Sequence, residues 1–114
     1  MPLTLYGIPN CDTVKKARTW LEAKGTAYTF HDYKKAGIDA ASLKRWMGVV
    51  GKDTLLNTHG TTWRKLDEAE RSNLSDARAI ALMQAHPSVI KRPVLEGKDI
   101  LLVGFNAEQW ESLL

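Results

Sequence analysis

Residues 3–17 have the sequence LTLYGIPNCDTVKKA, which predicts a strand, a turn and the start of a helix. Leu3–Gly7 is an apolar run of strand length, and Ile8-Pro9-Asn10 carries turn signals. The helix that begins at Asp12 places apolar residues at helical spacing, namely Val14, Ala17 and Leu21. Cys11, the only cysteine of the 114 residues, therefore stands at or just before the first turn of a helix.

The place of Cys11 favours an ionised thiol. The first N–H groups of a helix have no intrahelical partner, and the helix dipole favours negative charge there. The thiolate, not the thiol, is the nucleophile. Lys15 and Lys16 are close enough to support a thiolate, whereas the carboxylate of Asp12 acts against it. Redox chemistry at Cys11 is the leading hypothesis, and the alternative is a small buried hydrophobic residue.

The cysteine count restricts the mechanism. A dithiol redox centre needs a second cysteine three residues after the first, and Val14 occupies that position. An internal disulfide is impossible, so a thiol from outside has to resolve any mixed disulfide. We expect glutathione as this co-substrate, with no bound cofactor.

Size and composition predict one globular domain that needs neither disulfides nor metal. The chain is 44% hydrophobic and 25% charged, with a net charge of +3. No dense basic run is present, so we expect a small anionic or disulfide substrate rather than nucleic acid. The histidines have no metal-ligand spacing, and no metal site is expected; they are His31, His59 and His86. Without a signal peptide or an apolar run of about 20 residues, we expect a cytoplasmic monomer that does not contact membranes.

The middle of the chain predicts a second strand followed by helices. Tyr28–Tyr33 alternates as a strand does, and residues 34–37 are expected to form a loop. Asp39 is placed to cap an amphipathic helix that ends at Gly51. Residues 52–74 are less regular, with Leu55 and Leu56 buried and a short helix at 61–66. Ser75 then caps a helix that runs to about His86.

The C-terminal part predicts a hairpin and a helix. Apolar runs at 93–96 and 99–103 flank Gly97-Lys98, a hairpin signal, and Asn106 caps the last helix with Gln109 as its partner. The order β-α-β, helices, β-β-α is thioredoxin-like: an α/β fold whose mixed four-stranded sheet has a parallel first pair and an antiparallel last pair. Residues 1–114 form one domain, with an all-helical insert at about 38–88.

Arg92-Pro93 precedes the third predicted strand. In a thioredoxin-like fold this point lies beside the helix terminus that carries the cysteine. A proline there is often cis and exposes the preceding backbone to a peptide-like ligand, so Arg92 would point toward Cys11. The alternative is an ordinary proline at a strand start. Arg64, taken alone, is a solvated basic residue on a short helix.

Four segments together resemble the ArsC family: residues 7–17, 61–66, 91–94 and 103–105. This family includes glutaredoxin-coupled arsenate reductases, the Spx transcriptional regulators and a YffB branch of presumed thiol reductases, and the sequence resembles the YffB branch most. The resemblance spans nearly the whole chain.

The resemblance implies roles for individual residues. Cys11 matches the nucleophile of the arsenate reductases, and Arg64 and Arg92 match two of the three arginines that bind the oxyanion. The third arginine falls at Phe105, and a histidine that precedes the cysteine falls at Gly7, so the match to arsenate chemistry is incomplete. Two arginines still suit an anionic group such as a carboxylate of glutathione.

The function that follows is a glutathione-dependent thiol/disulfide reductase with a single cysteine nucleophile. Cys11 is the expected catalytic residue, Lys15 supports it, and the substrate or glutathione is bound by Asn10, Arg64, Arg92 and Pro93. Two alternatives stay open. One is an arsenate reductase; the other is a non-catalytic Spx-like module that docks on a protein partner, although the two-cysteine switch of many Spx proteins is absent.

Overall fold

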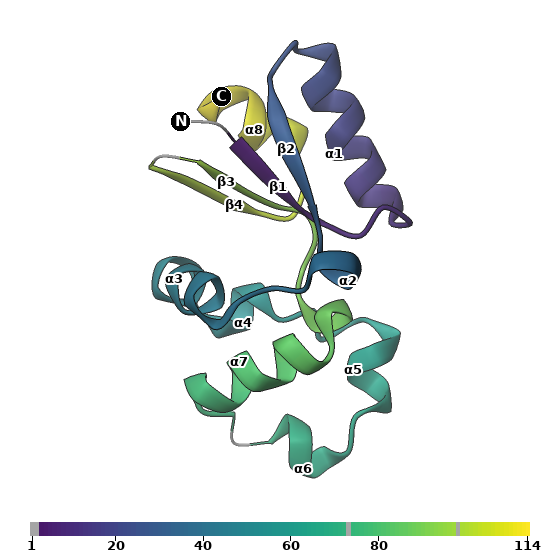
Figure 1. The fold of residues 1–114 in the computed structure, drawn as a ribbon, viewed down its shortest axis with the longest axis vertical. Helices are drawn as coiled ribbons and strands as arrows, with labels where there is room; N and C mark the ends of the chain where they lie inside the picture. The colour runs from purple at the N-terminus through teal and green to yellow at the C-terminus, as the bar shows by residue number, and fades with distance from the viewer. Residues whose placement is uncertain (1–2, 73, 98) are drawn as a thin grey trace. The chain divides into compact units, whose positions relative to one another are not determined.

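The computed structural model describes residues 3–72, 74–97 and 99–114 and contains a four-stranded sheet with the strand order β2-β1-β3-β4 (Figure 1). The strands are β1 (Leu3–Gly7), β2 (Tyr28–Asp32), β3 (Val94–Gly97) and β4 (Ile100–Val103). β1 pairs with β2 in parallel, and the β1–β3 and β3–β4 pairs are antiparallel. The predicted mixed sheet is confirmed. Lys98, which belongs to the predicted hairpin turn, lies outside the described residues.

Two helices cover one face of this sheet, α1 (Asp12–Ala23) and α8 (Ala107–Leu113). Their apolar sides meet the strand residues that alternate toward that face, because successive strand residues point to opposite faces. The resulting core contains Leu5, Ala17, Leu21, Leu95, Leu102 and Trp110. This packing holds α1 against β1, and so determines the position of Cys11, the last of the four residues that connect them.

The chain after β2 differs from the prediction. A short helix, α2 (Tyr33–Ala36), replaces the expected strand residue Tyr33 and the first three residues of the expected loop at 34–37. The Asp32 carboxylate accepts hydrogen bonds from the backbone N–H groups of Lys34 and Lys35, at 2.9 and 3.3 Å, and so stabilises this turn of helix. β2 therefore ends at Asp32, and the strand prediction over Tyr33 was wrong.

The helices after α2 follow the predicted caps. α3 (Ala40–Val50) begins at Asp39, whose side chain accepts from the Ser42 N–H at 2.7 Å, and ends at Gly51 with a φ of +82°. α7 (Asp76–Ala85) begins at Ser75 and is followed by the 3-10 helix η1 (Pro87–Val89). The region between them is more helical than expected, with α4 (Lys52–Leu55), α5 (Thr61–Lys65) and α6 (Glu68–Arg71).

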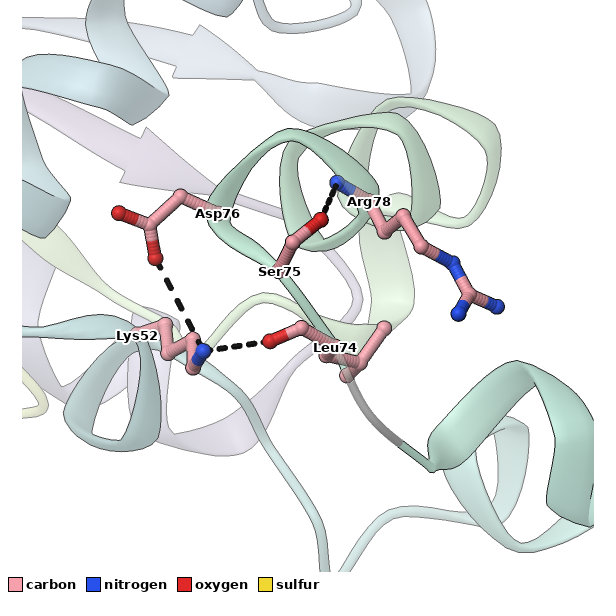
Figure 2. A network of polar contacts seen from close by, with 5 residues as sticks. All are labelled: Lys52, Leu74, Ser75, Asp76 and Arg78. Atoms are coloured by element: carbon pink, nitrogen blue, oxygen red, sulfur yellow. Dashed lines mark hydrogen bonds and ion pairs between the residues drawn. The ribbon is translucent and has the colours of Figure 1, made fainter.

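A polar network fastens the start of α7 (Figure 2). The Ser75 hydroxyl accepts from the Arg78 N–H at 3.2 Å, the geometry of a helix N-cap. From α4, the Lys52 ammonium donates to the Leu74 carbonyl and lies 3.8 Å from the Asp76 carboxylate. Lys52 thereby ties α4 to the residues that begin α7.

The chain packs as two compact units. One comprises the described residues up to Ala36 together with those from Arg92 onward, and the other is Gly37–Lys91, which overlaps the helical insert expected at about 38–88. The first unit contains the sheet with α1, α2 and α8. None of the described helices is long and apolar enough to cross a membrane.

Candidate functional site

Cys11 lies where the sequence predicts it, at the N-cap of α1. Its backbone is extended, with φ −118° and ψ 126°, and its carbonyl accepts from the Lys15 N–H at 2.9 Å. The thiol is partly buried, and Cys11 is a free cysteine. A side chain at the N-cap faces the N–H groups of the first helical turn, which have no intrahelical acceptor.

The surroundings of Cys11 lower the pKa of its thiol. Partial burial is the largest influence and raises the pKa, but it is outweighed by the Val14 N–H, the Arg92 side chain and the Thr13 N–H, which stabilise the thiolate by hydrogen bonding. The positive charge of Arg92 adds to the lowering. Among the described residues, the Cys11 side chain makes no capping hydrogen bond to the N–H groups of α1. The N–H groups and Arg92 therefore stabilise mainly the thiolate form of Cys11.

Strand pairing explains why Arg92 lies near Cys11. Tyr6 of β1 is opposite Val94 of β3, and the two strands are antiparallel. Continued by two residues, this register places Arg92 beside position 8, in the turn that leads to Cys11. Arg92 is partly buried, and the Arg92–Pro93 peptide bond is cis. The pairing of β3 with β1 thus brings Arg92, which is distant in sequence, close to the Cys11 thiol.

Gly7 leaves no room for a side chain in front of Cys11. A Cβ atom at this position would lie 2.8 Å from Val14 Cγ2 and 3.3 Å from Val14 Cγ1. Val14 itself is completely buried. The site is therefore built from backbone N–H groups and Arg92, and β1 supplies no polar side chain at position 7.

The other predicted site residues lie in different surroundings. Asn10 is exposed in the turn before Cys11, and Pro93 is buried directly after Arg92. Lys15 is exposed. The described groups that lower the pKa of Cys11 do not include Lys15. Arg64 is exposed on α5 in the other compact unit, and its contact with an anion stays a prediction.

Sequence reasoning missed an aromatic cluster on the opposite face of the sheet from α1. Tyr6 and His31 are paired across β1 and β2, with ring centroids 4.9 Å apart, and Tyr33 lies 6.3 Å from Tyr6. Burial raises the pKa of Tyr33, the Tyr6 hydroxyl adds to this, and the Arg92 charge opposes it. Tyr33 stays protonated at neutral pH. The pattern Tyr6/His31 could have been found from strand register, but α2 was not predicted, so Tyr33 was placed in a strand.

Across residues 3–72, 74–97 and 99–114, no three His, Cys, Asp or Glu side chains are grouped so that they could hold a metal ion. The chemistry that the site can perform is nucleophilic attack by a stabilised thiolate, with a guanidinium at hand for an anionic group.

Comparison with known proteins places this chain in a family. The family model described as "ArsC family" matches residues 6–113. An "Uncharacterized protein" of Haemophilus influenzae is 38% identical over 110 residues, which is 96% of each chain. The "Global transcriptional regulator Spx" of Listeria innocua is 27% identical over 114 residues, covering 98% of this chain and 86% of the regulator.

Solved structures agree with this relationship. A "YFFB" protein is 55% identical, with a TM-score of 0.93 over 96% of both chains. An arsenate reductase (ArsC) related protein from Brucella melitensis is 56% identical, with a TM-score of 0.77 over 98% of this chain and 93% of that one. An arsenate reductase from Vibrio cholerae is 25% identical, with a TM-score of 0.85 over 100% and 98% of the chains. These are thioredoxin-like α/β structures, and this chain belongs to the ArsC family.

Proposed function

We propose that this chain is a glutathione-dependent thiol/disulfide reductase that uses Cys11 as its single nucleophile. The observation that supports this most is the thiol at the N-cap of α1, whose pKa is lowered by the Val14 and Thr13 N–H groups and by Arg92 despite partial burial. A lowered pKa increases the thiolate fraction at neutral pH. The similarity to the YFFB protein, at 55% identity, adds support.

The proposed reaction has two thiol–disulfide exchanges. The Cys11 thiolate attacks the glutathione sulfur of a mixed disulfide R–S–S–G, forms Cys11–S–S–G and releases R–S⁻, which takes a proton from water. A second glutathione, as its thiolate, attacks the glutathione sulfur of the adduct, forms glutathione disulfide and restores the Cys11 thiolate. In sum, R–S–S–G and one glutathione give R–SH and glutathione disulfide.

The remaining predicted residues have proposed roles in holding glutathione. Arg92 is beside the thiol and binds a carboxylate while it stabilises the thiolate. Pro93 shapes the backbone on which the peptide-like ligand lies, and Asn10 contacts the ligand from the turn. Arg64 binds a second anionic group. Glutathione implies the cytoplasm, where thiols are kept reduced, and the chain acts there as a monomer.

The experiment is a turnover assay with the glutathione mixed disulfide of cysteamine. Formation of glutathione disulfide is followed with glutathione reductase and NADPH. Turnover by the wild type, none by Cys11→Ser and near-normal turnover by Arg18→Ala would support the proposal. Arg18 is the matched cation, because it lies over the Phe30 ring at 4.4 Å and is not among the groups that shift the pKa of Cys11. Equal rates for the wild type and Cys11→Ser would refute it.

Arsenate reduction is the second enzymatic candidate. It would use the same Cys11 thiolate, and a solved relative from Vibrio cholerae is titled an arsenate reductase. Two positions weigh against it: Phe105 stands where the resemblance expects an arginine, and Val14 fills the space at Gly7 where it expects a histidine. Adding arsenate in place of the mixed disulfide in the same assay tests it, and arsenate-dependent formation of glutathione disulfide would reverse the ranking.

An Spx-like docking role is the non-catalytic candidate. The Spx regulator of Listeria innocua aligns with 98% of this chain. Docking needs a surface rather than an active thiol, so Cys11→Ser separates the two possibilities in cells. A strain that carries Cys11→Ser in place of the wild-type chain would keep its phenotype if docking were the function.

A further inference from the structure

A hollow of about 450 Å³ lies along the part of α1 that follows Cys11. Trp20 of α1 and Phe105, between β4 and α8, supply its aromatic wall, and the small residues Ala23 and Ala107 leave the space open. None of these four residues takes part in the proposed exchange at Cys11. The hollow is contained in the unit that holds the sheet.

The aromatic wall is held in place from behind. The Trp20 and Phe105 rings are 6.3 Å apart in an edge arrangement, and both pack edge-on against the completely buried Trp110, at 5.9 and 4.8 Å. A wall that is fixed before the ligand arrives loses little conformational entropy on binding. Both rings are themselves partly exposed, so apolar surface faces the hollow. An aromatic or branched apolar group is the chemistry that such a surface takes up.

The rim of the hollow is cationic. Lys15 and Lys16 line it, and no acidic side chain does. Neither lysine has an ion-pair partner among the described residues. By contrast, Lys24 at the end of α1 is paired with Glu111 at 2.6 Å. Two free ammonium groups beside an apolar wall favour an occupant that combines an apolar body with a carboxylate.

The distance to Cys11 suits a ligand that is joined to the thiol site. Lys15 lies one helical turn after Cys11, to whose carbonyl it donates, so the hollow begins about 6 Å along the helix from Cys11. It continues for about 12 Å more to Ala23, at 1.5 Å per residue. A group of benzyl size attached to sulfur spans the first 6 Å or so and reaches into the hollow that begins there.

We propose that this hollow binds the non-glutathione half of the mixed disulfide, and that this half is a small organic thiol with an apolar, preferably aromatic, body and a carboxylate. This deepens the proposed function, on which it rests. In the first exchange the Cys11 thiolate takes the glutathione sulfur, and the released thiol R–SH leaves from the hollow. Arg92 serves the glutathione half, and the walls along α1 select R.

Four substrates test the selection. They are glutathione mixed disulfides of 4-(mercaptomethyl)benzoate, benzyl mercaptan, thioglycolate and cysteamine, which carry ring and carboxylate, ring alone, carboxylate alone, and a cation. We expect the first to have a kcat/KM at least about tenfold above that of the cysteamine compound, with the other two between, as burial of a ring and one charge contact allow. Equal kcat/KM for all four overturns the proposal and leaves the reductase function standing.

Two variants locate the effect. Ala107→Trp fills the hollow from the start of α8, and Lys16→Glu reverses one rim charge; both positions are exposed. Each should remove most of the preference for the aromatic acid, and Ala107→Trp should retain turnover of the cysteamine compound. Ala27→Trp, at an exposed position outside the lining, is the control for an added ring. A preference that survives both variants contradicts the assigned place.

A binding measurement is independent of turnover. S-(4-carboxybenzyl)glutathione and S-methylglutathione cannot be reduced, and calorimetry gives their affinities for the wild type and for Ala107→Trp. The carboxybenzyl compound should bind about tenfold more tightly to the wild type and lose this advantage in the variant. If this difference in affinity is found while no mixed disulfide is turned over, the proposed binding site is supported and the reductase proposal is wrong. Equal affinity of the two compounds for the wild type, or no binding of either, contradicts the proposal that the hollow is a binding site.

Discussion

Gly7 and Val14 are in direct contact where β1 leads into α1, since a Cβ atom on Gly7 would lie 2.8 Å from Val14 Cγ2. The contact lets the helix approach the end of the strand closely. It also keeps position 7 free of side chains immediately before the turn that carries Cys11. The small residue at this point is a packing requirement, and it excludes the polar neighbour that the arsenate reductases are expected to have.

Gly7→Ala should lower the free energy of unfolding by about 1–3 kcal/mol, because the added methyl group has to displace the buried Val14. Val14→Ala alone should cost roughly 1–3 kcal/mol through the space it leaves. The double variant should lose less than the sum, since the new methyl group then enters that space. Urea unfolding of the four proteins measures the cycle.

A second glycine serves as the control. Gly48 is exposed in α3, and a Cβ there would meet nothing within 4 Å. Gly48→Ala should therefore leave stability unchanged or raise it by up to about 1 kcal/mol, because glycine is a poor helix former. Strict additivity in the cycle would show that Gly7 and Val14 do not constrain each other.

Arg92→Ala should raise the pKa of Cys11. Both the hydrogen bond from Arg92 and its positive charge stabilise the thiolate, and neither remains in the variant, while the partial burial that opposes ionisation does. The rate of alkylation by iodoacetamide, followed across pH, should rise at a higher pH than in the wild type. At neutral pH the variant should react more slowly.

Two further variants make this measurement specific. Arg92→Lys keeps the charge and should recover part of the shift, although an ammonium cannot reproduce the guanidinium geometry. Arg18→Ala removes an equal charge from the same unit and should leave the profile of Cys11 unchanged. A profile for Arg92→Ala that coincides with the wild type would exclude Arg92 from the thiolate site.

Local signals in the sequence were sufficient for most of the fold. The caps Asp39, Ser75 and Asn106 each accept from the backbone N–H three residues later, as their residue types predict. α2 escaped prediction because its four residues contain no apolar periodicity and depend on the Asp32 carboxylate. α6 is equally short, and no helix of four residues has a reliable periodic pattern.

The same distinction between local signals and long-range contacts applies to the candidate site. Cys11 could be placed from sequence because the N-cap is a local feature of one strand and one helix. Arg92 could be placed only through the expected pairing of β3 with β1. The hollow could not be anticipated, because Trp20 and Phe105 are brought together by Trp110, and contacts between residues so distant in sequence leave no local pattern.

Ser75→Ala should lower the free energy of unfolding by about 1 kcal/mol, since the hydroxyl satisfies the Arg78 N–H at the start of α7. Figure 2 shows that Lys52 reaches this same helix start, so the loss should be felt in α4 as well. Ser75→Asp retains an acceptor at the cap and should restore stability. Hydrogen exchange of α7 amides, compared across the three proteins, gives the local result; unaltered exchange in Ser75→Ala would argue against the cap.

Cys11 should also make stability depend on pH. Its pKa is lower in the folded chain than in the unfolded one, so between these two values the unfolded state binds more protons. The free energy of unfolding should therefore rise with pH through this interval. The contribution of Cys11 is fully present above the unfolded pKa and is lost as the pH falls through the folded pKa. Cys11→Ser lacks the ionisation, and all other titrating groups cancel in the comparison. Urea unfolding of both proteins under reducing conditions should give a difference that grows from acid to alkaline pH. A difference that is constant with pH would mean that the thiolate gains nothing from folding, and the nucleophile assigned to this site would lose its physical basis.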